Sequence, residues 1–233
     1  MSASSQAIKA LHELHLKLHG VREDLARGPR QIAAKQSAVD KRRAELEARR
    51  DKLKQLKVTA DQKNLQLKTN EAKINDLRAK LNVAASNREY EIITGQIAAD
   101  TMANSVLEDE ILETLTRIDQ MQAEVKEAEQ DVATAEAALK QTQADVAARE
   151  PGLKEAAAAL EQQVAEAEKF LPADIVPQYR RAVQGFGADA LAAVENKVCT
   201  ACHMQLTAQR LVELNSGKLM FCGCGRLLYT PER

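Results

Sequence analysis

The chain has 233 residues and a net charge of −1, with 29% charged residues, 3% aromatic residues and no tryptophan. This composition is typical of long helices, and with no Ser/His/Asp arrangement and no glycine-rich phosphate loop we expect a protein that is not an enzyme. It also lacks a run of about 20 apolar residues and an apolar signal-peptide core, so we expect a cytoplasmic protein without a membrane span.

The first half of the chain carries a long heptad pattern. An apolar residue stands at every seventh position from Leu11 to Leu81. This period predicts a long helix in a left-handed coiled coil. The positions three residues further on include Lys35, Arg42 and Arg49, which could mark a place where the helices separate or admit another chain.

A second heptad run extends from Tyr90 to Ala167 and is apolar at every step except Asn104. Between the two runs, Ser86 and Glu89 have the spacing of a capping box. We therefore expect a turn near residues 84–87 and an antiparallel pair of helices. Tyr90 is a candidate partner-binding residue at this turn, or it caps the seam between the helices.

Charge supports pairing within one chain. Residues 1–85 carry a net charge of +9 and residues 86–170 a net charge of −12, so each helix attracts the other more than a copy of itself. The basic run at 41–57 could bind nucleic acid, but we favour pairing with the acidic helix. At Gly28-Pro29 and Pro151-Gly152 the heptad phase continues, which predicts bends and not helix ends.

Three histidines, His12, His15 and His19, share one face of the first helix. We expect this face to be exposed, with a surface metal site or a pH-sensing role as alternatives.

After Phe170 the pattern changes to short elements. We expect a short helix around 173–184, a turn at 185–187, and a strand that turns at 195–196 and returns into the first cysteine pair. A helical turn at 207–215 and strands at 219–221 and 226–229 complete the tail. The large core-forming side chains are concentrated here, so the tail is expected to build the compact core.

All four cysteines lie in this tail, at Cys199, Cys202, Cys222 and Cys224, in the pattern C-x2-C-x19-C-x-C. Closely spaced thiols in a short tail whose few large apolar side chains make only a marginal core predict a structural Zn²⁺ site that stabilises the fold. We expect Gly223 and Gly225 to permit the short second loop. A site of three cysteines with His203, or a redox pair of Cys222 and Cys224, are the alternatives.

These motifs together resemble a bacterial family of coiled-coil proteins with a C-terminal C4-type zinc ribbon. The resemblance rests on NREYE at the turn, LPADIVPQYRR, CTACHMQL and the terminal CGCGRLLY, and it spans essentially the whole chain. The family has a C-P-x-C-G-R motif, whereas Phe221 stands where its first cysteine is expected. The resemblance implies an adaptor or regulatory role, linked in some members to a sigma factor, to flagellar or secretion regulation, and to nucleic-acid binding.

The sequence thus predicts a mainly α protein: an antiparallel coiled-coil hairpin at 1–171, then a short helix and a β-rich zinc ribbon at 172–233. We expect a non-enzymatic adaptor that binds protein partners, with no small-molecule substrate. A nucleic-acid-binding regulator is the alternative, and a thiol redox protein a lesser one. The candidate partner-binding residues are Tyr90, Arg180, Arg181, Arg210 and Arg226.

Overall fold

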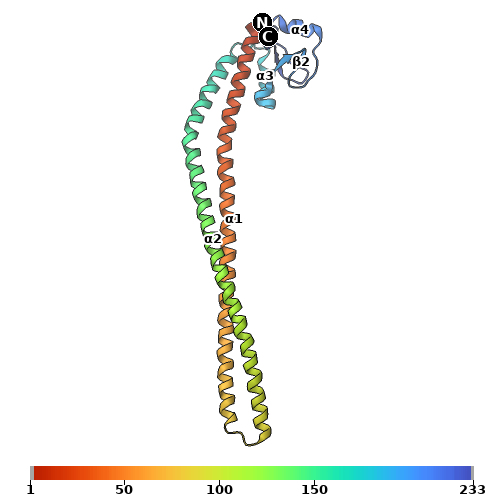
Figure 1. The fold of residues 1–233 in the computed structure, drawn as a ribbon. Helices are drawn as coiled ribbons and strands as arrows, with labels where there is room; N and C mark the ends of the chain where they lie inside the picture. The colour runs from red at the N-terminus through yellow and green to blue at the C-terminus, as the bar shows by residue number, and fades with distance from the viewer. Residues whose placement is uncertain (1–2, 232–233) are drawn as a thin grey trace. The chain divides into compact units, whose positions relative to one another are not determined.

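The computed structural model describes residues 3–231. Its elements in chain order are α1 (Ala3–Leu81), α2 (Asn87–Glu168), α3 (Val176–Phe186), the 3-10 helix η1 (Gly187–Ala190), β1 (Leu191–Glu195), β2 (Val198–Cys199), α4 (Ala208–Asn215) and β3 (Leu227–Tyr229). The two long helices pack as a hairpin and a small three-stranded sheet follows them (Figure 1). The predicted fold class is confirmed.

Contacts divide the chain into two compact units. Unit 2 consists of residues 34–140, and unit 1 contains the described residues of 1–33 and 141–233. The sequence-based division into a hairpin at 1–171 and a tail domain at 172–233 stays a prediction. Residues 3–33 of α1 belong to the same compact unit as the tail.

Unit 2 is an antiparallel pair formed by the second half of α1 and the first half of α2 (Figure 1). Its seam is built from the predicted heptad positions and their companions. Buried along it are Val39, Leu46, Ala60, Ile74, Leu77, Ile93, Leu107, Ile111, Ile118, Met121, Ala128, Val132, Ala135 and Leu139. Two polar residues, Asn104 and Thr114, are buried in the same seam.

The turn between the long helices occupies residues 82–86. The backbone N–H of Glu89 donates to Ser86 Oγ at 3.2 Å, and the Glu89 carboxylate accepts from the backbone N–H of Ala85 at 3.1 Å. These reciprocal bonds cap the first turn of α2 much as the Ser-x-x-Glu spacing predicts, with Ala85 as the donor in place of Ser86.

Ion pairs connect the basic helix to the acidic one. The described residues of unit 2 form four such pairs. They join Arg50 to Glu129 at 2.8 Å, Lys63 to Glu110 at 3.0 Å and Lys73 to Asp100 at 2.8 Å. The fourth joins Arg43 to Glu136. In unit 1, Arg22 pairs with Glu161 at 2.7 Å. Each of these pairs has its cation on α1 and its anion on α2, as the charge asymmetry of the sequence predicts.

The basic run at 41–57 contributes directly to this pairing through Arg43 and Arg50. Arg49, from the polar part of the seam, donates to the backbone carbonyl of Glu124 at 3.1 Å and so connects the helices. Lys35 and Arg42 are exposed. The proposed separation of the helices at these residues stays a hypothesis.

Both helices continue through their internal prolines, Pro29 and Pro151, so the prediction that these are not helix ends is confirmed. Gly28 is buried, and a Cβ added there would lie 2.8 Å from Val146 Cγ1. Gly28 therefore lets α1 and α2 approach closely within unit 1, a role that the sequence analysis did not assign to it.

The sheet of unit 1 has the strand order β2-β1-β3. β1 pairs antiparallel with β2, with Val194 opposite Cys199, and parallel with β3, with Leu191 opposite Leu227. The turn at 196–197 places Asn196 and Lys197 at positive φ, as a tight hairpin requires.

Side chains alternate across this sheet into two buried clusters. Leu191, Ala193, Leu227 and Tyr229 face a cluster that includes residues of α1, α2 and α3. Their neighbours Ala192, Val194 and Leu228 face a second cluster with Cys199, Leu206, Leu214, Met220 and Cys222. Both faces of the sheet are covered, which explains its continuous run of apolar residues.

The tail does not build its core alone, which corrects the sequence analysis. Ile8, Leu11 and Leu18 of α1 belong to the same cluster as Tyr179 and Tyr229. Two further expectations were also inaccurate. The short helix extends through Phe186 where a turn was expected, and residues 219–221 form no strand, only a single bridge from Phe221 to Leu227.

Candidate metal centre

The side chains of the four cysteines converge in unit 1. The Sγ atoms of Cys199, Cys202, Cys222 and Cys224 all lie within 4.8 Å of one another, and those of Cys202 and Cys222 are 3.5 Å apart. All four thiols are free. Cys199 and Cys222 are buried, and Cys202 and Cys224 are half-buried. A group with this geometry could hold a metal ion.

The first pair sits on a tight loop that leaves β2. The backbone N–H of His203 donates to the carbonyl of Cys199 at 2.9 Å, and the N–H of Cys199 donates to the carbonyl of Met204 at 3.0 Å. His203 closes the loop at a φ of 59°. Its side chain is exposed and is not part of the group of close ligand atoms.

The second pair occupies an equally tight loop before β3. The N–H of Cys222 donates to the carbonyl of Arg226 at 2.8 Å, and the N–H of Gly225 donates to the carbonyl of Cys222 at 2.9 Å. The bridge between Phe221 and Leu227 closes the base of this loop. The C-x-C spacing thus places both thiols on one side of a short hairpin.

The two glycines of this loop are not equivalent. Gly225 has a φ of 91°, a conformation that residues with a Cβ rarely adopt, so glycine is required there. Gly223 is not among the residues at positive φ, and a Cβ added there would meet no atom within 4 Å. The expectation that both glycines serve the turn therefore holds for Gly225 alone.

The loop gives its two thiols contrasting acidities. Burial raises the pKa of Cys222 to about 12. Burial also acts to raise the pKa of Cys224, but hydrogen bonds from the backbone and side chain of Arg226 and from the neighbouring thiols outweigh it and lower that pKa to about 6. A thiolate is thus favoured at the more exposed of the two positions.

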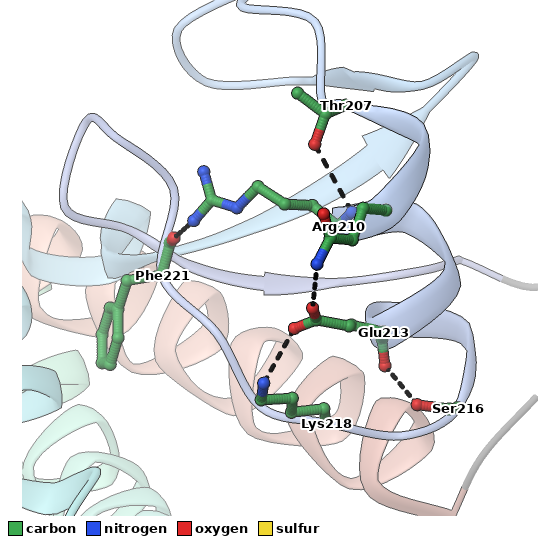
Figure 2. A network of polar contacts seen from close by, with 7 residues as sticks. Thr207, Arg210, Glu213, Ser216, Lys218 and Phe221 are labelled. Atoms are coloured by element: carbon green, nitrogen blue, oxygen red, sulfur yellow. Dashed lines mark hydrogen bonds and ion pairs between the residues drawn. The ribbon is translucent and has the colours of Figure 1, made fainter.

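A polar network around α4 supports the second loop (Figure 2). Thr207 caps α4 by accepting from the N–H of Arg210, and the Arg210 guanidinium donates to the carbonyl of Phe221 at 2.6 Å. Glu213 pairs with Lys218 at 2.8 Å. Arg210 therefore positions the residue that precedes Cys222.

The other candidate partner-binding residues lie in varied environments. Arg226 donates to the carbonyl of Asp189 at 2.8 Å, and its guanidinium lies 4.2 Å from the ring centroid of Phe186. Arg180 and Arg181 are exposed on α3. Tyr90 is 53% exposed and belongs to unit 2. The structure brings Arg210 and Arg226 to the cysteine loop, where both bond to backbone carbonyls.

A buried polar chain that the sequence analysis missed joins α1, α2 and α3. Tyr179 Oη donates to Glu168 at 2.8 Å and lies 2.5 Å from His15 Nε2. Because the hydroxyl has a single hydrogen, His15 Nε2 is the donor in that contact. The expectation that this histidine face is exposed is wrong for His15, which is 7% exposed.

His12 forms a second such contact, with Nδ1 2.9 Å from Tyr229 Oη. His19 is exposed, as expected. A signal in the sequence could have found His15: with Ile8, Leu11 and Leu18 it forms a stripe at helical spacing. The stripe points to burial, and a buried histidine needs a polar partner.

Comparisons with known proteins establish the fold. No protein-family model matches the chain, and no curated protein matches it. Among solved structures, CT398 from Chlamydia trachomatis has a TM-score of 0.79 at 18% identity, covering 98% of each chain. HP0958 from Helicobacter pylori has a TM-score of 0.71 at 14% identity, covering 100% of this chain and 99% of that one. A protein from Mycobacterium smegmatis has a TM-score of 0.55 at 18% identity, covering 97% of each.

In the described part of the chain, no helix combines the length and apolar character that a bilayer crossing needs.

Proposed function

We propose that this chain is a cytoplasmic, non-enzymatic adaptor in which a helical hairpin presents a structural zinc ribbon to a protein partner. The observation that carries the proposal is the convergence of four cysteine Sγ atoms within 4.8 Å. Tetrahedral zinc with Zn–S bonds of about 2.3 Å needs sulfurs about 3.8 Å apart, which suits this group. Four thiolates would fill the coordination sphere and leave no position for a substrate.

Two large apolar side chains of the ribbon are exposed and are candidates for contact with a protein partner. Met204, next to the first cysteine loop, is 67% exposed, and Val212 on α4 is 69% exposed. Apolar side chains of this kind contribute to protein interfaces and have no part in phosphate binding, so they are the residues to test first. The resemblance to bacterial zinc-ribbon proteins makes the transcription machinery the first partner class to test.

The metal part of the proposal is tested by elemental analysis and thiol titration of purified protein. We expect one zinc per chain, no reactive thiols in the zinc-loaded form, and loss of zinc in C222S. Reactive thiols that cycle between reduced and disulfide forms without metal would support a redox protein instead.

The partner part is tested by crosslinking in native cells with wild-type protein, M204S and V212S. We expect both variants to retain zinc and lose the partner, whereas L16S, at an exposed apolar site on α1, keeps it. Binding of nucleic acid that weakens steeply with salt and is unaffected by M204S and V212S would favour the nucleic-acid-binding alternative.

A further inference from the structure

The first part of α2 carries a second heptad stripe that faces away from the hairpin seam. It consists of Ile92, Gly95, Ala99, Met102 and Val106, spaced alternately by three and four residues. All five are exposed, and the large ones strongly so: Ile92 61%, Met102 76% and Val106 57%. We refer to these five residues as the outer stripe.

The surroundings of the outer stripe are unusual for a solvent-facing helix. Between Ile92 and Leu107 the only charged residue is Asp100, which pairs with Lys73 of the same hairpin. A Cβ added at Gly95 would meet no atom within 4 Å, so there is open space above this position. An apolar a/d pattern of this kind is what a helix needs to bind another helix.

We propose that the outer stripe is a self-association surface, on which the α2 helices of two chains pack antiparallel about a two-fold axis. Size complementarity supports a second copy as the occupant. In the register that places Ala99 opposite Met102 of the other copy, Gly95 lies opposite Val106. Each central layer then combines one small and one large residue, as close packing of two helices requires.

Charge complementarity selects the same register. Arg88 and Glu113 continue the stripe at its two ends, and both are exposed. The antiparallel register places Arg88 of each copy opposite Glu113 of the other, which also pairs with Arg117 of its own helix, and it places Ile92 opposite Asp109. A parallel pairing would instead place arginine against arginine, glutamate against glutamate, and Met102 against Met102.

The charges also disfavour a membrane surface as the occupant. The sequence from Glu89 to Thr116 contains no lysine or arginine but seven acidic residues, Glu89, Glu91, Asp100, Glu108, Asp109, Glu110 and Glu113. An interfacial helix that binds anionic lipid carries basic residues on its polar face, so a membrane surface does not suit this one. The paired stretch from 88 to 113 spans about 38 Å at about 1.5 Å per residue, which suits a reversible dimer.

Sedimentation equilibrium of the full chain over the micromolar range tests the proposal. We expect wild-type protein to pass from monomer to dimer with concentration. M102E should weaken dimerisation about tenfold or more, because the two-fold axis buries the added carboxylate twice. The matched control L65E, at a residue that is 67% exposed on α1, should dimerise like the wild type.

Charge reversal tests the register. R88E and E113R should each weaken the dimer, and the double variant R88E/E113R should restore it. Far-UV circular dichroism of each variant checks that the helices are intact. A wild-type chain that stays monomeric, a dimer insensitive to M102E, or single reversals without effect would overturn the proposal. Loss of a different protein partner in M102E with no change in mass would assign the stripe to that partner instead.

Discussion

Buried His15 and half-buried His12 make the stability of unit 1 dependent on pH. Burial lowers the pKa values of His12 and His15 below 6.5, with smaller raising effects from Asp189 and Glu13 at His12 and from Glu168 at His15. Below pH 6.5 the unfolded chain therefore binds more protons than the folded one. The resulting loss of stability develops as the pH falls from about 6.5.

We expect the contribution of His12 and His15 to the free energy of unfolding of unit 1 to be constant above about pH 7 and to decrease as the pH falls below about 6.5. Near-UV circular dichroism of tyrosine is a suitable measurement, because two of the three tyrosines contact these histidines. The variant H12N/H15Q should flatten the pH dependence, and H19Q should leave it unchanged. An unaltered profile in the double variant would contradict the assignment.

The two glycines of the second cysteine loop should respond differently to substitution. G225A forces a residue with a Cβ to a φ of 91°, and we expect it to destabilise the ribbon by about 1–2 kcal/mol. G223A should be nearly neutral, because the added methyl group enters open space. Competition with a chelator measures both variants, and equal metal affinity for G223A and G225A would exclude this explanation.

At the scale of single residues, the sequence predicted that the four cysteines come together. It did not predict the contacts between histidines and tyrosines. Two close pairs of thiols are visible in the spacing, because each pair lies on one short loop. The bond between His15 and Tyr179 joins residues 164 positions apart, and that between His12 and Tyr229 joins residues 217 apart. Such contacts depend on how α1 and the tail pack, which no local pattern reports.

The long helices were the most predictable elements, because a heptad period repeats the same information many times along the chain. The start of α2 was also predictable, because the capping motif of Ser86 and Glu89 and the hydrogen bonds that it forms involve residues close together in the sequence. β3 was less predictable. Its parallel pairing with β1 depends on residues 36 positions away, and its three-residue length leaves little pattern to read.

Asn104 is the polar exception in the seam, and we expect it to cost stability. It is 6% exposed, and its Oδ1 has no hydrogen-bond partner among the described residues. Replacement by leucine removes an unsatisfied buried acceptor, so N104L should stabilise the hairpin by about 1–3 kcal/mol. Thermal unfolding followed by far-UV circular dichroism measures this change. A lower melting temperature for N104L would show that the amide is satisfied.

The ion pairs between α1 and α2 should contribute little individually. Arg43 and Glu136 are both largely exposed, so we expect R43E to lower the free energy of unfolding by less than about 1 kcal/mol. Reversal of both charges in R43E/E136R should recover most of the loss, and added salt should reduce the difference. Urea unfolding at low and high salt tests this. An effect of R43E that persists in high salt would indicate a packing role for the side chain.

At the scale of the molecule, removal of metal should perturb the ribbon more than the long helices. If the cysteines bind zinc as proposed, a chelator removes the ligand that holds the two loops together. We expect the near-UV signal of Tyr179 and Tyr229 to decrease while most of the far-UV helical signal remains. A control with a chelator saturated with zinc should change neither signal. Parallel loss of both signals would show that the hairpin also depends on the metal.

The contact between Ser5 and Thr230 has a consequence for synthesis of the chain. Ser5 Oγ donates to the carbonyl of Thr230 at 3.0 Å and accepts from its N–H at 2.9 Å. At about 5–20 residues per second, a ribosome makes Thr230 about 11–45 s after Ser5. Throughout that interval Ile8 and Leu11 lack the β3 residues that cover them. The start of α1 therefore keeps these apolar side chains uncovered until β3 has been made.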